Sequence, residues 1–396
     1  MICDFCVLST YFLRAKYYLH LNRLPNKMMK TQSQSSRRQF IKKTASASAL
    51  AITPAIWNKN ISLVGLKPKE KMGIALVGLG YYSGQVLAPA LQETENCYLA
   101  GVVTGTPEKE KVWAEKYDIE DQNIYNYENY DSIADNDDID IIYVVLPNAM
   151  HAEYVIRAAK AGKHVICEKP MASSAEECEA MIEACEDNQR KLSIGYRMQF
   201  EPHTQEIMRL GQEKVFGPVK MVNAGAGYRE SRADHWKLDK EMGGGAMMDM
   251  GVYALQAARY VTGEEPVAVT AQSFTTRPEI FTEVDETTMF QLEFPSGALA
   301  NLHTSFGMSM NYLNVTADKG WFKLDPFSAY RGIAGESKEG PINFPQVNQQ
   351  AVQMDEQAMS VMDDKPMRVP GEEGLRDMRV VEAIYKAIDS GDQEKV

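Results

Sequence analysis

Three side chains in this sequence have the types and the spacing that oxidation of an alcohol requires. Lys169 follows a short apolar run, and Asp249 precedes Tyr253 by four residues, which is one turn of a helix. The reaction needs a group that takes the hydroxyl proton and a cation that stabilises the developing alkoxide. A tyrosine ordinarily loses its proton at about pH 10, and an adjacent ammonium favours the anion. We therefore expect Tyr253 to accept the proton, Lys169 to stabilise the charge, and Asp249 to orient Lys169 or bind substrate.

Alternating strands and helices are predicted for the part of the chain that contains Lys169. Apolar, β-rich runs occur at residues 73–78, 98–104, 141–146, 164–167 and 192–196. Continuously apolar runs such as IIYVVL are typical of parallel strands that are buried on both faces. Repeated strand–helix–strand units predict an α/β Rossmann domain with a doubly wound parallel sheet over residues 73–195. Ligands of such sheets bind at the carboxyl ends of the strands, where Lys169 is placed.

The first strand leads into a glycine-rich turn, Gly78-Leu79-Gly80-Tyr81-Tyr82-Ser83-Gly84. Gly78 and Gly80 stand where a dinucleotide fingerprint needs a tight turn and close approach of the backbone to a pyrophosphate. The third fingerprint position is Ser83, so the match is incomplete. Its place between a strand and a helix nevertheless indicates a cofactor site.

The end of the second strand favours NADP over NAD. NAD-selective sites usually place Asp or Glu there to bind the ribose hydroxyls. This chain has Thr104-Gly105-Thr106, followed by Lys109, and small hydroxyls with a lysine suit a 2′-phosphate. We predict NADP, tightly bound, with NAD as the alternative.

Further candidates lie near strand ends or ahead of the glycine run at 243–245. A tryptophan ahead of this glycine run suits stacking on the face of a sugar. The additional cofactor candidates are Tyr81, Tyr82, Leu146, Pro147, Asn148, His151, Glu168, Lys169 and Arg197, with Arg197 expected to project from the last strand. The substrate candidates are Lys169, Tyr228, Trp236, Asp249 and Tyr253.

Residues 196–396 predict an α+β domain with a large, mostly antiparallel open sheet. A helix at 252–262 is expected to cover one face of this sheet. The other face is predicted to be rich in methionine and aromatic residues and to form a homo-oligomer interface, in a dimer or tetramer. A terminal helix at about 372–389 is expected to pack back on the first domain.

Two long segments resemble the signatures of the Gfo/Idh/MocA oxidoreductase family. They are LPNAMHAEYVIRAAKAGKHVICEKPMA (146–172) and MGGGAMMDMGVYALQAARYVTGEEP (242–266), and the resemblance runs from about Gly73 to Asp389. Within the family the chain is most similar to the glucose–fructose oxidoreductase branch, because Tyr253 stands where most relatives carry His. That resemblance implies a sugar substrate, oxidation of an aldose at C1, and reduction of a second sugar by the same bound cofactor.

Three alternatives remain open on the sequence. One is a glycoside hydrolase of the same fold that uses NAD transiently. Another is a different sugar or polyol dehydrogenase of the family. The third is a sensing protein with a vestigial site, which the intact set of Lys169, Asp249 and Tyr253 disfavours.

The N-terminal region predicts export. Ser36-Arg37-Arg38-Gln39-Phe40-Ile41-Lys42 resembles a twin-arginine signal, and a short apolar run follows it. We expect a signal peptide at residues 29–55, an arm at 56–72, transport by the twin-arginine machinery and a periplasmic location. Residues 1–28 fit no leader and are interpreted as an over-extended gene prediction.

Composition excludes other partners and sites. The chain has 42 basic and 54 acidic residues, and nine of the basic residues lie in the first 55. The acidic remainder argues against nucleic-acid binding. No stretch of the expected mature protein is long and apolar enough for insertion in a membrane. Residues 135–140 (DNDDID) lack the ligand spacing of a calcium loop, and no metal site is predicted.

Overall fold

The computed structural model describes residues 69–396. The predicted leader at 29–55, the preceding residues 1–28 and all but the end of the arm at 56–72 lie outside the described residues. Within residues 69–396, no helix is long and apolar enough to cross a membrane. The same residues contain no group of three or more His, Cys, Asp or Glu side chains that could hold a metal ion.

The first domain is built on a parallel sheet with the strand order β3-β2-β1-β4-β5-β6. The order reverses between β1 and β4, and this switch creates a crevice at the carboxyl ends of the two strands. The strands are β1 (Met72–Val77), β2 (Cys97–Val103), β3 (Ile124–Tyr125), β4 (Ile141–Val144), β5 (His164–Cys167) and β6 (Leu192–Ile194). The predicted Rossmann fold is confirmed, with the two-residue β3 as an addition that no apolar run marks.

Strand β1 serves two hydrophobic cores, one on each face of the sheet. Ala75 and Val77 pack with residues of α4 and α5, whereas Ile74 and Leu76 pack with residues of α2 and α8. Because successive side chains of a strand point to opposite faces, such a strand must be apolar at every position. The helices of this domain are α2 (Ala88–Leu91), α3 (Pro107–Tyr117), α4 (His151–Lys160) and α5 (Ala175–Asp187), and α8 (Gln349–Met362) joins them from the end of the chain.

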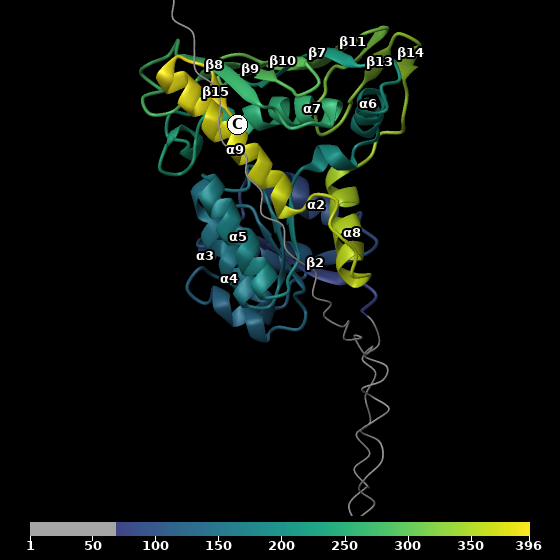
Figure 1. The fold of residues 1–396 in the computed structure, drawn as a ribbon. Helices are drawn as coiled ribbons and strands as arrows, with labels where there is room; N and C mark the ends of the chain where they lie inside the picture. The colour runs from purple at the N-terminus through teal and green to yellow at the C-terminus, as the bar shows by residue number, and fades with distance from the viewer. Residues whose placement is uncertain (1–68) are drawn as a thin grey trace, which may run out of the picture. The chain divides into compact units, whose positions relative to one another are not determined.

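The second domain contains a sheet of order β14-β13-β12-β11-β7-β10-β9-β8-β15. Strands β7 and β10 are parallel, and the other neighbouring pairs for which a register is defined are antiparallel. The strands are β7 (Val219–Gly227), β8 (Ala268–Phe274), β9 (Thr287–Glu293), β10 (Leu299–Ser305), β11 (Met310–Ala317), β12 (Gly320–Leu324), β13 (Gly335–Ser337), β14 (Gly340–Ile342) and β15 (Glu394–Lys395). Helices α6 (Pro202–Gln212) and α7 (Val252–Thr262) lie against one face (Figure 1). The predicted mostly antiparallel sheet is confirmed.

The outward face of this sheet is more polar than the sequence suggested. Exposed Met289, Leu299 and Trp321 lie on it, as expected. Its central row, however, is polar and runs through Gln291, Asn301, Asn223 and Asn314 in direct register. Alternation within a strand marks its half-exposed face but does not reveal which residues become neighbours across strands.

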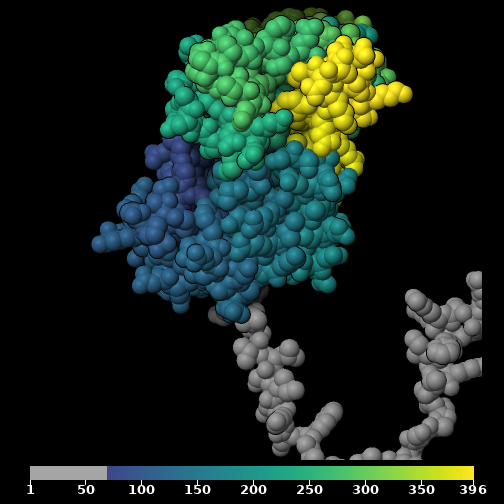
Figure 2. Space-filling view, turned by 90° about the vertical axis from the view of Figure 1, so that its left-hand side faces the viewer, coloured from purple at the N-terminus to yellow at the C-terminus, as the bar shows by residue number. Residues whose placement is uncertain are grey.

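The terminal helix α9 (Gly371–Ser390) contacts α5 in the first domain and β8 in the second. In Figure 2 the C-terminal residues, in yellow, lie against both the blue and the green parts of the surface. Glu382 accepts a hydrogen bond from the backbone N–H of Ala175 at 2.8 Å, and Arg379 pairs with Glu179 at 2.8 Å. Helix α9 therefore joins the two domains.

Candidate active site

Lys169 and Asp249 come from different domains and meet at the carboxyl edge of the parallel sheet. Lys169 follows β5, and its peptide bond to Pro170 is cis. The Lys169 ammonium donates to the backbone oxygen of Asp249 at 2.6 Å and to its Oδ1 at 3.2 Å. Each of the two side chains is 12% exposed. Folding thus joins two of the three predicted catalytic residues, which stand 80 positions apart in the chain.

Asp249 lies in a π-helical segment, η7 (Met247–Gly251), which leads directly into α7. The predicted single α-helical turn between Asp249 and Tyr253 is therefore wrong. A π-turn closes i→i+5 hydrogen bonds and widens the helix locally, and such segments are frequent at functional sites. The wider turn changes the direction of Asp249 relative to Tyr253.

Asp285 fixes the start of this segment. Its Oδ2 accepts a hydrogen bond from the backbone N–H of Met247 at 2.8 Å, and its Oδ1 accepts one from the Tyr385 hydroxyl at 3.0 Å. Gly245 has a φ of +117°, and a Cβ added there would collide with the Asp285 carboxylate. The three glycines at 243–245 therefore form a closely packed entry to the helix.

Two ammonium groups hold Asp249. Lys237, in the 3₁₀ helix η6 (Trp236–Leu238), donates to Asp249 Oδ2 at 2.6 Å. Burial alone would raise the pKa of Asp249, but Lys237 and Lys169 outweigh burial and hold the pKa well below its usual range. Burial would lower the pKa of Lys169, but the charges of Tyr253 and Asp249 hold it above its ordinary value. The pair is therefore ionised at neutral pH.

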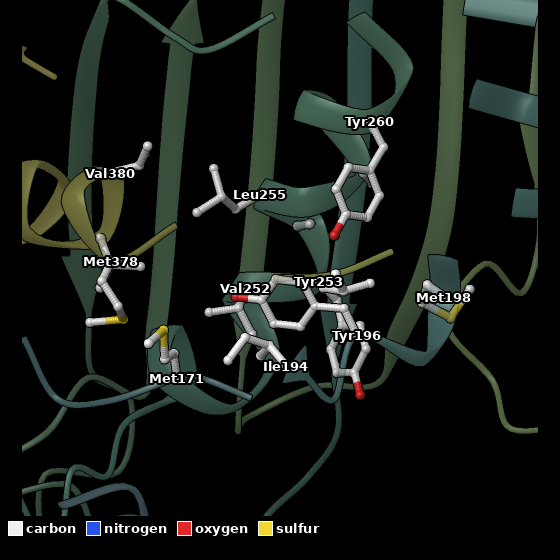
Figure 3. Packing of buried hydrophobic residues seen from close by; sticks show 14 of the residues in the cluster. Met171, Ile194, Tyr196, Met198, Val252, Tyr253, Leu255, Tyr260, Met378 and Val380 are labelled. Atoms are coloured by element: carbon white, nitrogen blue, oxygen red, sulfur yellow. The ribbon is translucent and has the colours of Figure 1, made fainter. Parts of the chain in front are cut away.

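Tyr253 completes the set at the start of α7. Figure 3 shows it in the buried cluster with Ile194 and Tyr196. The Lys169 ammonium lies 4.8 Å from the centre of its ring, and the Arg197 guanidinium lies 5.2 Å from it. Two cations therefore lie beside the ring of Tyr253.

The glycine-rich turn fits a dinucleotide. Gly78 has a φ of +90°, a conformation that favours glycine. A Cβ added at Gly80 would meet no atom within 4 Å, so this glycine leaves open space where a pyrophosphate would approach the backbone. Lys109 Nζ donates to the backbone oxygen of Leu79 at 2.9 Å, which places this predicted phosphate ligand beside the turn. Thr104 is buried at the same strand end.

The remaining residues of this end of the first domain are placed as follows. Gly105 packs against the ring of Tyr127. Tyr81 is 74% exposed, whereas the Tyr82 ring lies 5.9 Å from that of Tyr330. Tyr330 belongs to the loop between β12 and β13, so this pair links the two domains beside the crevice.

His151 and Asn148 connect loops. The ring nitrogens of His151 lie 2.9 Å from the backbone oxygen of Leu146 and 3.0 Å from that of Pro170. The residue has no accessible surface, and burial lowers its pKa. Both ring nitrogens of His151 thus meet backbone oxygens, and its cofactor contact stays a prediction. Asn148, which follows Pro147, is buried and donates to the backbone oxygen of Gly243 at 2.7 Å.

Glu168 and Arg197 are also held by the protein. Glu168 Oε1 accepts a hydrogen bond from the Tyr143 hydroxyl at 2.7 Å, and burial raises the pKa of Glu168. Arg197 begins the 3₁₀ helix η5 (Arg197–Phe200) and does not project from a strand as predicted. Its guanidinium donates to the backbone oxygen of Ser328 and lies 4.6 Å from the ring centre of Tyr330.

Lys237, which the sequence did not single out, contacts the predicted substrate residues. Tyr228 donates to Asp249 Oδ2 at 3.2 Å. The ring centre of Trp236 lies 6.0 Å from Lys237 Nζ. Trp236 is therefore connected to Asp249 through Lys237. Lys237 had one signal in the sequence, its place beside Trp236 ahead of the glycine run. Tyr330 had none, because its loop is far from every motif.

Two family models match the chain. An oxidoreductase family with an NAD-binding Rossmann fold matches residues 72–196, and a GFO/IDH/MocA C-terminal domain matches residues 204–323. Together these matches span more than half of the chain.

Similar proteins include two archaeal enzymes. The D-xylose 1-dehydrogenase (NADP(+)) of Haloarcula marismortui is 30% identical over 80% of this chain and 91% of the relative. The D-xylose 1-dehydrogenase (NADP(+)) 2 of Haloferax volcanii is 31% identical over 67% of this chain and 83% of the relative. Among solved structures, the aldose-aldose oxidoreductase from Caulobacter crescentus complexed with glycerol has a TM-score of 0.81 and 43% identity, covering 82% of this chain and 100% of that one.

Proposed function

The chain belongs to the Gfo/Idh/MocA family of oxidoreductases, and on that premise we propose that it oxidises an aldose at C1 with NADP as the hydride acceptor. The observation that carries this proposal is the meeting of Lys169, Asp249 and Tyr253 beside the crevice of the Rossmann domain. The names of the similar xylose dehydrogenases and of the similar aldose-aldose oxidoreductase support a sugar as substrate.

The residues of the site divide the tasks of this reaction among them. Bound NADP supplies the hydride acceptor. Tyr253 takes the proton of the C1 hydroxyl while Lys169, 4.8 Å from its ring, stabilises the negative charge. Asp249 fixes Lys169 through two hydrogen bonds and is ionised, so it also accepts hydrogen bonds from sugar hydroxyls. Tyr82, Tyr330 and Arg197 form an aromatic and cationic wall that limits access of water.

A second sugar is the proposed acceptor for the hydride. In that cycle the cofactor returns to its oxidised form without leaving the protein, so free NADP is not needed outside the cytoplasm. Export through the twin-arginine route, which carries folded proteins, is the companion proposal and rests on the motif at Arg37 and Arg38. Replacing both arginines by lysine should retain the protein in the cytoplasm. Fractionation that finds the variant in the periplasm would contradict this.

Assembly through the outward face of the C-terminal sheet is proposed for the same molecule. Three large apolar residues, Met289, Leu299 and Trp321, are 40–44% exposed on this face. In a two-fold interface, the exposed apolar residues of two copies would pack together, and the polar rows of the two sheets could form hydrogen bonds with each other.

The test of the activity uses protein purified from the cytoplasm through gel filtration without added nucleotide. Absorbance in the reduced-nicotinamide band should rise on addition of glucose or xylose and fall on addition of a second sugar. Extraction should yield NADP. An absence of any change with a panel of aldoses would contradict the proposed function. Release of nitrophenol from a nitrophenyl glycoside without an acceptor sugar would favour a glycoside hydrolase of the same fold.

A further inference from the structure

Asp249 receives one ammonium on each carboxylate oxygen. Lys169 donates to Oδ1 at 3.2 Å and Lys237 donates to Oδ2 at 2.6 Å. Lys237 comes from η6, on a segment unconnected to the β5 end that carries Lys169. The Tyr228 hydroxyl lies 3.2 Å both from Asp249 Oδ2 and from Lys237 Nζ, and it closes the ring of contacts. The side chain of Lys237 is 22% exposed.

The other charged groups near Asp249 are already paired or distant. Glu230 is held by Arg232, whose hydrogen bonds lower the pKa of Glu230 to about 2. Burial raises the pKa of Tyr228, so Tyr228 remains a neutral donor. His235 precedes η6, and burial lowers its pKa, so it is neutral at physiological pH. The two lysines are therefore the cations in direct contact with the carboxylate of Asp249.

A buried carboxylate that only one cation stabilises takes up a proton more readily, and it can then compete with Tyr253 for the substrate proton. Burial favours the neutral acid, and each ammonium opposes that tendency. With two ammonium groups, Asp249 has no tendency to take a proton at neutral pH. With one, the effect of burial would be opposed less strongly, and a protonated Asp249 would lose its ion pair with Lys169 while the backbone oxygen of Asp249 kept its hydrogen bond.

We propose that Lys237 is a positioning residue of the active site: its ammonium keeps Asp249 ionised and directed at Lys169, so that Tyr253 alone accepts the substrate proton. This inference rests on the proposed function, because it assigns a task within that reaction. Lys237 thereby joins the site without contacting the reacting atoms.

The test compares Lys237→Met, Lys237→Arg and the control Lys240→Met in aldose oxidation across pH 5–9. Lys240 is exposed in the same loop. In K237M we expect kcat to fall at least tenfold at pH 6 and less at pH 8, so that activity declines more steeply toward acid pH than in the wild type. K237R should restore the wild-type profile, and K240M should match the wild type. A pH profile of K237M parallel to that of the wild type, or a change in KM alone, would overturn the proposal.

A second readout does not depend on turnover. The Asp249 carboxyl carbon can be followed by ¹³C NMR in aspartate-labelled protein, with Asp249→Asn identifying the signal. In wild type it should remain ionised to the lowest pH at which the protein stays folded, and in K237M it should titrate at higher pH. An unchanged titration would refute the role of Lys237. Failure of the wild type to oxidise any aldose while this titration shifts would instead refute only the proposed function.

Discussion

Lys169 keeps its proton at neutral pH, and this decides which side chain can act as the base. The charges of Tyr253 and Asp249 outweigh burial and raise its pKa, so it serves as a cation. Asp249 is held ionised by two ammonium groups and is a poor proton acceptor. In the proposed reaction, this leaves Tyr253 as the proton acceptor among the residues in contact.

Replacing Tyr253 by Phe should therefore remove chemistry and leave binding intact. We expect kcat for aldose oxidation to fall by about 10²–10⁴-fold, the usual contribution of a positioned base. The amount of NADP that remains bound after gel filtration should not change. The matched control is Tyr98→Phe, since Tyr98 is an exposed tyrosine on β2. A Y253F enzyme with more than a tenth of wild-type kcat would contradict the assignment.

The proposed catalytic residues were predictable where the sequence concentrates them in motifs. Lys169, Asp249 and Tyr253 stand in two segments that resemble a family, and the chemistry of their side chains suggested their proposed roles. Lys237 and Tyr330 were missed because their contacts arise only when loops from distant strands close over the sheet edge. The backbone contacts of His151 could not be predicted, because its position in a motif does not reveal which groups its ring nitrogens meet.

The π-helical segment η7 depends on glycine for its entry. Gly245→Ala would combine a backbone with φ of +117° with a Cβ that collides with the Asp285 carboxylate. Gly297 also has a positive φ, +82°, but a Cβ there meets nothing within 4 Å. We expect G297A to lower the free energy of unfolding by about 1 kcal/mol. G245A should lower it by about 1–3 kcal/mol more and reduce activity, because η7 carries Asp249. Equal effects of the two variants in urea unfolding would contradict this.

Strand β5 contains a histidine that makes stability depend on pH. His164 Nδ1 accepts a hydrogen bond from the backbone N–H of Lys191 at 3.0 Å, and burial lowers the pKa of His164 to about 4. An unfolded histidine titrates at about 6.5, so the unfolded state alone takes up a proton as pH falls from 6.5 to 4. Stability must fall through that window.

The variant His164→Gln keeps an acceptor and loses the titration. We expect its free energy of unfolding to depend less on pH between 6.5 and 4, by up to about 1.4 kcal/mol per pH unit. Above pH 7 its pH dependence should match that of the wild type. Urea unfolding at half-unit intervals measures both slopes, and identical slopes below pH 6.5 would contradict the prediction.

Elements with a clear hydrophobic period were predictable, and those shaped by tertiary contacts were not. The continuous apolar runs predicted the strands β1, β2, β4, β5 and β6 within a few residues. Strand β3 is too short to leave a pattern. The segment η7 carries the same residue types as an α-helix, and only the hydrogen bonds at its start, including that of Asp285, distinguish the two.

At the scale of the whole molecule, the end of the chain returns to the first domain. Helix α8 packs Ala351 and Met354 into the core under β1, and α9 contacts α5. These contacts hold the two domains together, so that Asp249 and Tyr253 of the second domain lie beside Lys169 of the first. The same arrangement leaves the outward face of the second sheet free for the proposed assembly.

Leu299 lies on β10 in that outward face and provides the test of assembly. Light scattering after gel filtration should give the wild type a mass that is a multiple of one chain. Leu299→Glu would place a charge in the proposed interface and should shift the mass to a single chain. The control is Val112→Glu, at an exposed position of α3 in the first domain. A wild-type mass of one chain, or no effect of L299E, would contradict the proposed interface.

The most direct measurement of the proposed cycle follows a deuterium atom. Protein free of added nucleotide is incubated with an aldose deuterated at C1 and with a second, unlabelled aldose, and the products are identified by mass spectrometry. Hydride transfer through a retained cofactor predicts a lactone or aldonic acid from the first sugar and an alditol from the second that carries one deuterium. Products without deuterium transfer, or an oxidised sugar formed only when free NADP is added, would contradict the account.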